Sequence, residues 1–398
     1  MRTIALNGGR SCMKIVDIKP FVVDCFRTNW VFVKVYTDEG IHGVGEATLE
    51  YKEKALLGAL EHIKEYLIGK DPFRIEDHWH HIYRDAYWRG GPVLMSALSA
   101  VECALWDILG KALGVPVYQL LGGRVNDDVR IYVNGWFSGA NTPIQFAEKA
   151  KIAMTRGVTA LKWDPFGSSY LDISNEALDR AIETVALVRE AVGNKVDLLI
   201  EAHGRFNIPT ALKIAKELEP FKPMFLEEPV PPDNLDALKN VRDKSPVAIS
   251  AGERLYSRWD YKKMFDLMAA DYIQPDISHA GGIMELKKIA AEAECRYVGF
   301  APHNPSGPVA NAATLQLAAC CPNFSILEIM YSDVPWRKDV TNEALVYENG
   351  RIKIPDKPGL GIEIDEDACL AHPYRTHTLR HYTGALTDIR PPESIFYF

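Results

Sequence analysis

Apolar and polar residues alternate near the start of the chain in the way that β-strands require. Valines occupy every second position of 31–35, inside a pattern of two strands that runs from 13 to about 47. Residues 38–40 (Asp-Glu-Gly) provide a tight turn. Between 53 and 122 the apolar residues recur at helical spacing instead, as in 97–113. The pattern predicts an N-terminal α+β block.

From about residue 129, short apolar runs alternate with helical patterns, and Thr142-Pro143 is a favourable helix start. The runs that follow lie at 160–163, 198–201, 224–227, 247–250, 272–274, 297–301 and 324–328. Repeated β-then-α order predicts a parallel sheet with right-handed crossovers, either a closed barrel or a doubly wound sheet. No glycine-rich nucleotide motif follows the early strands, which weakens the doubly wound alternative.

The change of pattern divides the chain into three segments. We expect the α+β block over 13–125 and the β/α segment over 126–334. Residues 335–398 are irregular and rich in proline and aromatic residues, and we expect them to pack on the N-terminal block.

Composition and charge limit the classes of protein to which the chain can belong. The net charge of the 398 residues is −8, so no overall basic field would attract nucleic acid. No apolar run reaches the ~20 residues needed to span a membrane, and residues 1–12 lack the apolar core of a signal peptide. Seven cysteines, an odd count without a CxxC pair, indicate reduced thiols in a cytoplasmic protein.

Three glutamates end successive apolar runs. Glu201, Glu227 and Glu253 are each separated by 26 residues, about one βα unit of a barrel. Their side chains would converge at the carboxyl end of three adjacent strands, and three oxygen ligands suit Mg²⁺. Glutamates also follow strands as helix caps or solvated loop residues, but three in equal register favour a metal site.

The same spacing continues along the chain. Asp276 follows Glu253 by 23 residues, His303 follows Asp276 by 27, and Glu328 follows His303 by 25. Asp276 and His303 would lie on neighbouring strand ends, where a carboxylate can fix the imidazole tautomer and raise its basicity. We therefore expect His303 to be a catalytic base rather than a structural histidine.

Two further strand ends carry polar pairs at a spacing of two. His203 follows Glu201 by two residues and therefore points to the same face, as a catalytic residue, a second metal ligand or a loop histidine. Lys162 and Asp164 are paired in the same way. Lys162 is expected either to contact a substrate carboxylate or enediolate oxygen, or to form ion pairs with the glutamates.

Several longer motifs accompany these residues: Thr-Asp-Glu-Gly and Gly-Val-Gly-Glu-Ala within 37–47, Ala-Leu-Trp-Asp-Ile-Leu-Gly-Lys at 104–111, Glu-Glu-Pro at 227–229, Gly-Glu-Arg at 252–254, Gln-Pro-Asp at 274–276, Ala-Gly-Gly at 280–282 and Pro-Gly-Leu-Gly at 358–361. Together they resemble the enolase superfamily, in particular its mandelate racemase-like subgroup. The resemblance covers 13 to about 366.

The resemblance implies a modified (β/α)₇β TIM-like barrel under an α+β capping domain, which the N-terminal block and the C-terminal tail build. It also implies Mg²⁺ on Glu201, Glu227 and Glu253, and a catalytic pair of His303 with Asp276. Glu328 matches the glutamate of the last strand.

Local patterns refine the resemblance. The motifs Leu-Ile-Glu-Ala-His-Gly-Arg-Phe and Lys-Trp-Asp-Pro-Phe-Gly resemble gluconate and galactonate dehydratases, in which the histidine matching His203 is the general acid. Asp164 stands where mandelate racemase has a lysine base, and Asp276 stands where muconate cycloisomerases have a lysine, so both of those activities are disfavoured.

These observations predict a Mg²⁺-dependent sugar acid dehydratase, a hydro-lyase. His303 would remove the C2 proton and His203 would protonate the departing 3-hydroxyl, giving a 2-keto-3-deoxy sugar acid. Lys162 would assist at the carboxylate, as would Glu328 if it is protonated and donates a hydrogen bond. The alternatives are an acid-sugar epimerase that uses the same enediolate, and a non-catalytic protein that binds a sugar acid.

Substrate contacts are expected from the capping block and the barrel. Loops near Arg27 and Trp30 and near 50–52 would cover the barrel mouth, and Trp88 and Asp164 are further candidates for substrate contact. We expect no nucleic acid or membrane partner, and the resemblance favours a homo-oligomer.

Overall fold

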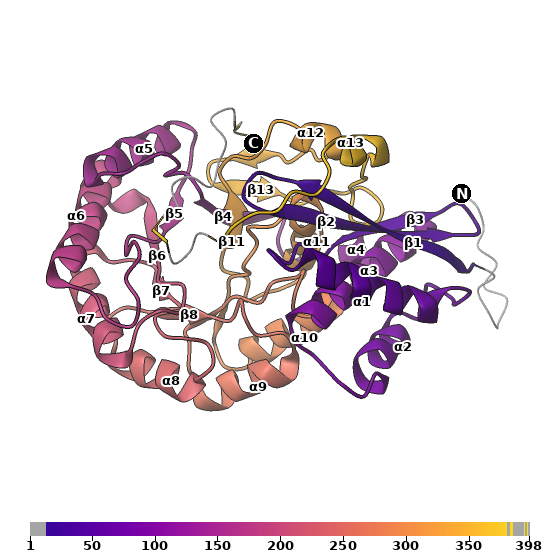
Figure 1. Cartoon of the computed structure of the whole chain (residues 1–398), viewed down its shortest axis with the longest axis horizontal. Helices are drawn as coiled ribbons and strands as arrows, with labels where there is room; N and C mark the ends of the chain where they lie inside the picture. The colour runs from indigo at the N-terminus through magenta and orange to yellow at the C-terminus, as the bar shows by residue number, and fades with distance from the viewer. Residues whose placement is uncertain (1–12, 380–382, 385–393, 395, 397–398) are drawn as a thin grey trace.

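Strand pairing in the computed structural model separates the chain into two sheets. The structure describes residues 13–379, 383–384, 394 and 396. Within them, one sheet has three antiparallel strands, and the other is built around parallel strands that form a barrel (Figure 1). The predicted α/β class, with a capping domain and a TIM-like barrel, is confirmed.

The capping domain contains the antiparallel sheet and the helices beside it. Its elements are β1 (Ile15–Asp24), β2 (Asn29–Thr37), β3 (His42–Glu46), α1 (Glu53–Leu67), α2 (Ile75–His80), the π-helix η1 (His81–Asp85), α3 (Pro92–Leu113) and α4 (Val117–Leu120). Gly43 and Gly45 let β3 lie directly on α3, because a Cβ at either position would meet the carbonyl oxygen of Ala104 or Ala100 at 2.0 or 1.8 Å.

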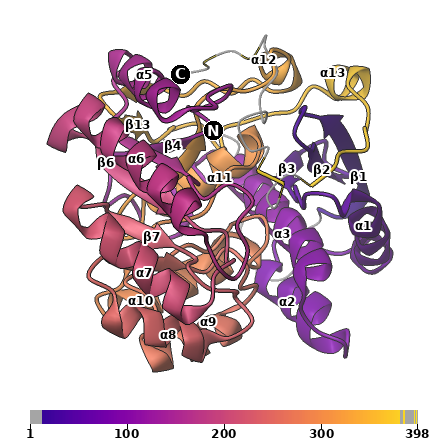
Figure 2. The same ribbon diagram turned by 60° about the vertical axis from the view of Figure 1, so that its left-hand side comes forward.

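Helix α3 is the central helix of this domain. Proline occupies its first turn, and Gly114 ends it in the left-handed conformation with φ 71°. Among the described residues it alone has the length and hydropathy of a membrane span, but 83% of its apolar window is buried within the fold. It contacts β3 of the antiparallel sheet (Figure 2) and also α10 (Gly282–Glu294) of the barrel.

Eight parallel strands form the barrel within the described residues. They are β4 (Asp128–Asn134), β5 (Ala160–Trp163), β6 (Asp197–Glu201), β7 (Phe225–Glu227), β8 (Ile249–Ala251), β9 (Tyr272–Ile273), β10 (Gly299–Phe300) and β11 (Leu327–Met330). Helices between them are α5 (Pro143–Thr155), α6 (Asn175–Val192), α7 (Ile208–Leu218), α8 (Leu235–Lys244), α9 (Arg258–Leu267), α10 (Gly282–Glu294) and α11 (Pro308–Ala318), with 3₁₀ turns at η2 (Gly193–Lys195) and η3 (Glu219–Phe221). Pairing of β11 with β4, together with a bridge between Phe300 and Phe324, closes the (β/α)₇β barrel.

The barrel interior is apolar at one end and polar at the other. An inward-facing apolar cluster fills the end where the strands begin, and its buried members are Tyr132, Ala160, Leu199, Phe225, Ala301 and Ile326. Two residues further along each strand, the same inward face carries polar side chains such as Asn134, Lys162, Glu201, Glu227 and Glu328. Period-two alternation therefore places the polar residues at the barrel mouth.

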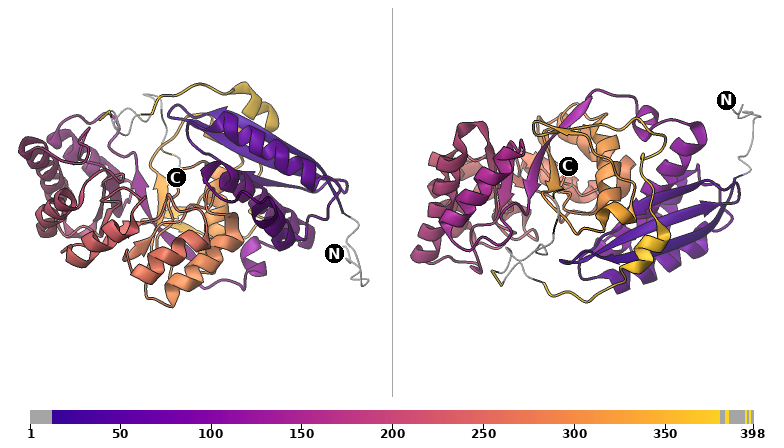
Figure 3. Two further views of the ribbon diagram at one scale, coloured as in Figure 1. Left: turned by 60° about the horizontal axis from the view of Figure 1, so that its bottom comes forward. Right: turned by 90° about the horizontal axis from the view of Figure 1, so that it is seen from above.

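The C-terminal segment contacts both domains. It contains α12 (Arg337–Val340), β12 (Tyr347–Glu348), β13 (Arg351–Lys353) and α13 (Glu366–Ala371). Strand β13 pairs antiparallel with β4 of the barrel, whereas α13 contacts β1 of the capping sheet (Figure 3). The segment therefore packs on the start of β4 in the barrel as well as on the capping sheet.

Two buried glutamates of the capping domain join it to the barrel. Glu46 accepts hydrogen bonds from the backbone N–H groups of Gly307 (2.6 Å) and Ala310 (2.8 Å), at the start of α11. Glu102 of α3 accepts from those of Ile283 (2.7 Å) and Met284 (2.9 Å), at the start of α10. Carboxylates suit helix N-termini, where N–H groups lack partners within the helix. Burial nevertheless raises the pKa of both glutamates to about 7.

Candidate active site

A cavity of about 360 Å³ opens at the carboxyl end of the barrel strands, under the capping domain. The capping domain contributes Arg27 and residues 48–52 to its walls, and the barrel contributes Lys162, Glu201, His203, Glu253 and His303 among others. Ligand sites of β/α barrels lie at this end. Most of the strand-end residues predicted from the sequence therefore meet in one cavity.

The three predicted metal ligands lie together. One carboxylate oxygen each of Glu201, Glu227 and Glu253 is within 4.8 Å of the others. Oε2 of the buried Glu227 has no hydrogen-bond partner, and burial together with the charge of Glu201 raises the pKa of Glu227 well above its usual value. A divalent cation would satisfy this oxygen and offset the crowded negative charge, so the cluster fits a divalent metal site.

Lys162 lies against these acids. Its Nζ is 2.7 Å from Oε1 of Glu227, 3.1 Å from Oε2 of Glu201 and 3.4 Å from Oε1 of Glu328. The side chain is almost fully buried, but it borders the cavity. Of the two roles expected from the sequence, ion pairing with the glutamates describes these contacts.

Glu328 is placed as a hydrogen-bond acceptor. Its Oε1 accepts from Nδ2 of Asn134 at 3.0 Å, and Oε2 accepts from the backbone N–H of Asn304 at 3.2 Å. Although burial opposes it, the charge of Lys162 lowers the pKa of Glu328. In the structure Glu328 acts as an acceptor, since a neighbouring ammonium group favours the carboxylate.

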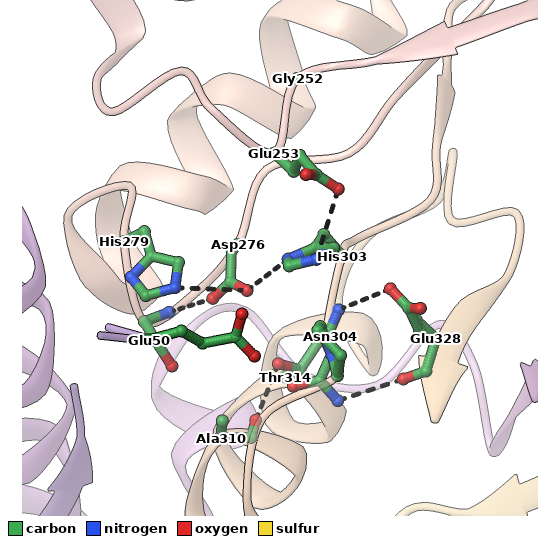
Figure 4. A network of polar contacts seen from close by, with 12 residues as sticks. Glu50, Gly252, Glu253, Asp276, His279, His303, Asn304, Ala310, Thr314 and Glu328 are labelled. Atoms are coloured by element: carbon green, nitrogen blue, oxygen red, sulfur yellow. Dashed lines mark hydrogen bonds and ion pairs between the residues drawn. The ribbon is translucent and has the colours of Figure 1, made fainter. Parts of the chain in front are cut away.

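His303 and Asp276 form the expected pair (Figure 4). Nδ1 of His303 lies 2.7 Å from Oδ2 of Asp276, and its Nε2 faces Oε2 of Glu253 at 3.3 Å. Asp276 is buried and also accepts from the backbone N–H of Ser278 at 2.7 Å. Although burial opposes it, the charge of Glu253 and the bond to Asp276 raise the pKa of His303 to about 10. Nε2 is thus the nitrogen available on the cavity side.

A second histidine–aspartate pair lies across the mouth. Nδ1 of His203 is 2.7 Å from Oδ2 of Asp164, and the backbone N–H of His203 donates to Oε1 of Glu201 at 2.6 Å. His203 adopts φ 49°, a left-handed conformation that is uncommon for histidine and is found at functional sites. Since β6 and β10 are four strands apart in a barrel of eight, His203 and His303 approach the cavity from opposite sides.

Asp164 is held by a residue that sequence reasoning did not single out. Nη2 of the fully buried Arg205 donates to both oxygens of Asp164, at 2.8 and 2.6 Å, and its other donors bind the carbonyl oxygens of Ala202 and Gly167. Asp164 borders the cavity as predicted, but its contacts make it the partner of His203 rather than a free substrate ligand. Residue spacing provided no signal for this contact, because Arg205 lies in the loop beyond β6 and not in the strand.

Of the remaining residues predicted to contact the substrate, one borders the cavity and two do not. Arg27 borders the cavity, and its guanidinium pairs with Glu50 and donates to the carbonyl oxygen of Pro305, so it joins two capping loops to the loop after β10. Trp30 is buried beside Phe32, away from the cavity walls. Trp88 is 79% exposed and does not border the cavity either. Sequence reasoning had omitted His279, Tyr256 and Leu379, which do border it.

Comparison with known proteins gives matches over most of the chain. Residues 17–122 match the model of the mandelate racemase/muconate lactonizing enzyme N-terminal domain, and residues 145–368 match that of the enolase C-terminal domain-like family.

Individual relatives match over nearly their full length. A D-galactonate dehydratase of Ralstonia pickettii is 40% identical over 370 residues, covering 90% of this chain and 96% of the relative. One of Xanthomonas campestris is 42% identical over 375 residues, with the same coverage. A crystal structure of an enolase superfamily member from Salmonella Typhimurium, 32% identical, superposes with a TM-score of 0.87 over 91% of this chain and 98% of that one.

Proposed function

The chain belongs to the mandelate racemase/muconate lactonizing enzyme family of the enolase superfamily, and on that premise we propose that it dehydrates a sugar acid to a 2-keto-3-deoxy acid. The family resemblance noted from the sequence is confirmed. The chain is a dehydratase of this superfamily, akin to the D-galactonate dehydratases that it resembles at about 40% identity.

One observation carries the proposal. Two histidines, each bound through Nδ1 to an aspartate at 2.7 Å, face one cavity from opposite sides, beside three carboxylates that fit a divalent cation. Removing a proton beside a carboxylate and expelling a neighbouring hydroxyl needs a base, an acid and a positive charge near the carboxylate. This cavity offers residues for each of these tasks.

Proton removal falls to His303. Its Nδ1–H donates to Asp276, so Nε2 is the atom that takes the C2 proton of the substrate. The negative charge of Glu253, which raises the pKa of His303, would be offset by a cation held there, and this would free the Nε2 lone pair. Glu201, Glu227 and Glu253 would hold Mg²⁺, which when bound supplies positive charge against the developing charge of the substrate carboxylate. Lys162, at the same cavity wall, adds a second positive charge.

Loss of the hydroxyl falls to His203. Because its Nδ1 is engaged by Asp164, Nε2–H is the proton that can be given to the 3-hydroxyl, which leaves as water. The C2 electron pair forms the C2–C3 double bond as the C3–O bond breaks. The resulting enol gains a proton at C3 and becomes the 2-keto-3-deoxy acid.

An acid-sugar epimerase is the alternative with the same residues. Its supporting observation is the placement of His203 and His303 on opposite sides of the cavity, where one could remove and the other return the C2 proton. A non-catalytic sugar-acid-binding protein is the alternative of another class, and it predicts binding without exchange of the C2 proton.

The test is to incubate the protein with Mg²⁺ and a panel of aldonates and aldarates, and to detect 2-keto products as semicarbazones. We expect product from one or a few stereoisomers, and loss of product in EDTA and in His303→Asn. His62→Asn, which changes an exposed histidine of α1, is the matched control and should retain activity. Absence of product from every acid would refute the dehydratase. Exchange of the C2 proton in D₂O would then identify an epimerase, and its absence a binding protein.

Location and assembly complete the proposal. No disulfide joins any two of the six cysteines among the described residues, which supports the expected reducing cytoplasm. The exposed aromatic rings of Tyr87 and Trp88, 78% and 79% exposed, support the expected homo-oligomer, since large exposed aromatic residues are typical of contact surfaces. Light scattering on the purified protein measures the assembly directly.

A further inference from the structure

A third histidine borders the cavity behind the His303–Asp276 pair. His279 lies in the loop between β9 and α10, and its side chain is 12% exposed. Its Nε2 is 3.9 Å from Oδ2 of Asp276, too far for a hydrogen bond. His279 and His303 lie on opposite sides of the Asp276 carboxylate (Figure 4). The ring of His279 therefore limits the positions that this carboxylate can adopt.

The contacts of Ser96 determine the tautomer of His279. Oγ of Ser96 donates its single proton to the carbonyl oxygen of Pro92 at 2.6 Å, so this oxygen can only accept from a second partner. Nδ1 of His279 is that partner, at 2.8 Å. Nδ1 must therefore carry a proton, and Nε2 is the atom that faces Asp276.

Ser96 belongs to a row of polar residues on α3 that holds the same loop. Ser99 accepts from the backbone N–H of Gly281 at 2.8 Å, and Glu102 accepts from those of Ile283 and Met284. Positions 96, 99 and 102 follow one face of the helix at a spacing of three. Trp79 adds an Nε1–H bond to the carbonyl oxygen of Gly281 at 2.9 Å. The capping domain thus holds residues 279–284 along their length, but only Ser96 binds the imidazole ring.

We propose that His279 is a positioning residue through which helix α3 of the capping domain holds the Asp276–His303 pair in the orientation for proton abstraction. The expected effect on kcat rests on the proposed function, whereas the expected effect on the orientation of the His303 ring does not. His279 acts through Asp276 and needs no contact with the substrate. It makes the base depend on the docking of a domain that contributes neither His303 nor Asp276.

Ser96→Ala and Ser99→Ala test the link as a matched pair. Each removes one hydroxyl from the same face of α3, one bond to a carbonyl oxygen four residues earlier and one bond to residues 279–284. We expect Ser96→Ala to lower kcat about tenfold, as loss of alignment does, with KM within about twofold, and Ser99→Ala to leave kcat near that of the wild type. Equal kcat values in the two variants would overturn the proposal.

Conservative replacement of His279 separates positioning from folding. Asn places an N–H donor near the position of Nδ1, whereas Leu offers none. His279→Leu should lower kcat about thirtyfold, and His279→Asn should recover most of that loss, with similar melting temperatures for both. If both variants only melt earlier while kcat stays unchanged, His279 is a structural residue and the proposal is wrong.

Imidazole NMR of ¹⁵N-histidine-labelled protein tests the link without any substrate. His279→Asn assigns the His279 ring, and His303→Asn assigns the His303 ring. We expect the His279 proton on Nδ1, and a shift of the His303 ring in Ser96→Ala but not in Ser99→Ala. A proton on Nε2 alone, or an unshifted His303 ring, would overturn the proposal. An inactive wild type with the expected spectra would instead refute the proposed function and leave the link standing.

Discussion

The two sides of the cavity mouth carry the same histidine–aspartate pair but support it differently. On the His203 side the supports come from the barrel itself, because Arg205 binds both oxygens of Asp164. On the His303 side many come from the capping domain. Arg27 binds the carbonyl oxygen of Pro305, Glu46 binds the start of α11, and Ser96 binds His279.

The two pairs differ in the charge around their aspartates and in their dependence on the capping domain. Asp164 is paired with a buried guanidinium, whereas the second basic side chain beside Asp276, that of His279, lies 3.9 Å away. Asp276 therefore has more negative charge to share with its histidine, which suits a base, and Asp164 has less, which suits an acid. Only the base side depends on how the capping domain docks. The two histidine–aspartate pairs can therefore act as base and as acid although their geometry is the same.

The largest effect should come from removing the base. His303→Asn should lower kcat by about 10³–10⁴-fold, the upper range for general base catalysis, and should abolish C2 proton exchange in D₂O. Proton NMR of the substrate measures exchange, and the semicarbazone assay measures turnover. Retained exchange in this variant would assign the base to another residue.

Removing the acid should separate the two chemical steps. His203→Asn should lower dehydration by about 10²–10³-fold while C2 exchange continues, because His303 remains in place. Asn tolerates the left-handed conformation of residue 203, so folding should be preserved. Parallel loss of exchange and dehydration would argue against distinct acid and base roles.

The charge difference predicts unequal costs in stability. Asp164→Asn leaves the guanidinium of Arg205 buried without its carboxylate, which should lower the free energy of unfolding by about 3 kcal/mol. Asp276→Asn leaves no buried guanidinium without a partner and should lower the free energy of unfolding by about 1 kcal/mol. Urea denaturation of the two variants measures both values. Equal costs would show that Arg205 does not stabilise the fold through Asp164.

The last prediction concerns Glu46, which docks the capping domain on the His303 side, and the dependence of stability on pH. Burial raises the pKa of Glu46 from 4.5 to about 7, so its protonated form is favoured in the folded state. This contribution is fully present below pH 4.5 and is lost as the pH rises through about 7, with a slope of at most about 1.4 kcal/mol per pH unit.

Glu46→Gln removes this titration. The free energy of unfolding of the variant relative to the wild type should therefore rise between pH 5 and pH 8. Urea denaturation at the two pH values measures the difference, and Glu39→Gln in the exposed turn after β2 is the control. A difference that is independent of pH would show that Glu46 does not titrate in this range.

Much of this architecture was predictable because the βα repeat places strand ends at regular intervals. Equal spacing brought Glu201, Glu227 and Glu253 into register, and alternation indicated that Asp164 faces inward. Neither pattern predicts which side chains then meet. The Asp164–Arg205 contact depends on the path of the loop beyond the strand.

Local sequence patterns did not predict the contacts between the two domains. Ser96 and His279 are 183 residues apart, and no local periodicity links them. The direction of the pKa shift of Glu328 likewise depends on its three-dimensional surroundings, where burial opposes the charge of Lys162. The two tryptophans Trp30 and Trp88 were candidates by residue type alone, and type did not indicate whether they would be buried, exposed or at the cavity.

The split origin of the capping domain has a consequence for biosynthesis. Its first strand, β1, leaves the ribosome before the barrel strands, whereas α13, which packs against β1, leaves after them. The side-chain amide of Asn29 likewise donates to the carbonyl oxygen of Arg375 and accepts from its backbone N–H, 346 residues later. Contacts of such sequence separation form late and slow folding. The nascent chain therefore completes this cap only after the whole barrel has been synthesised.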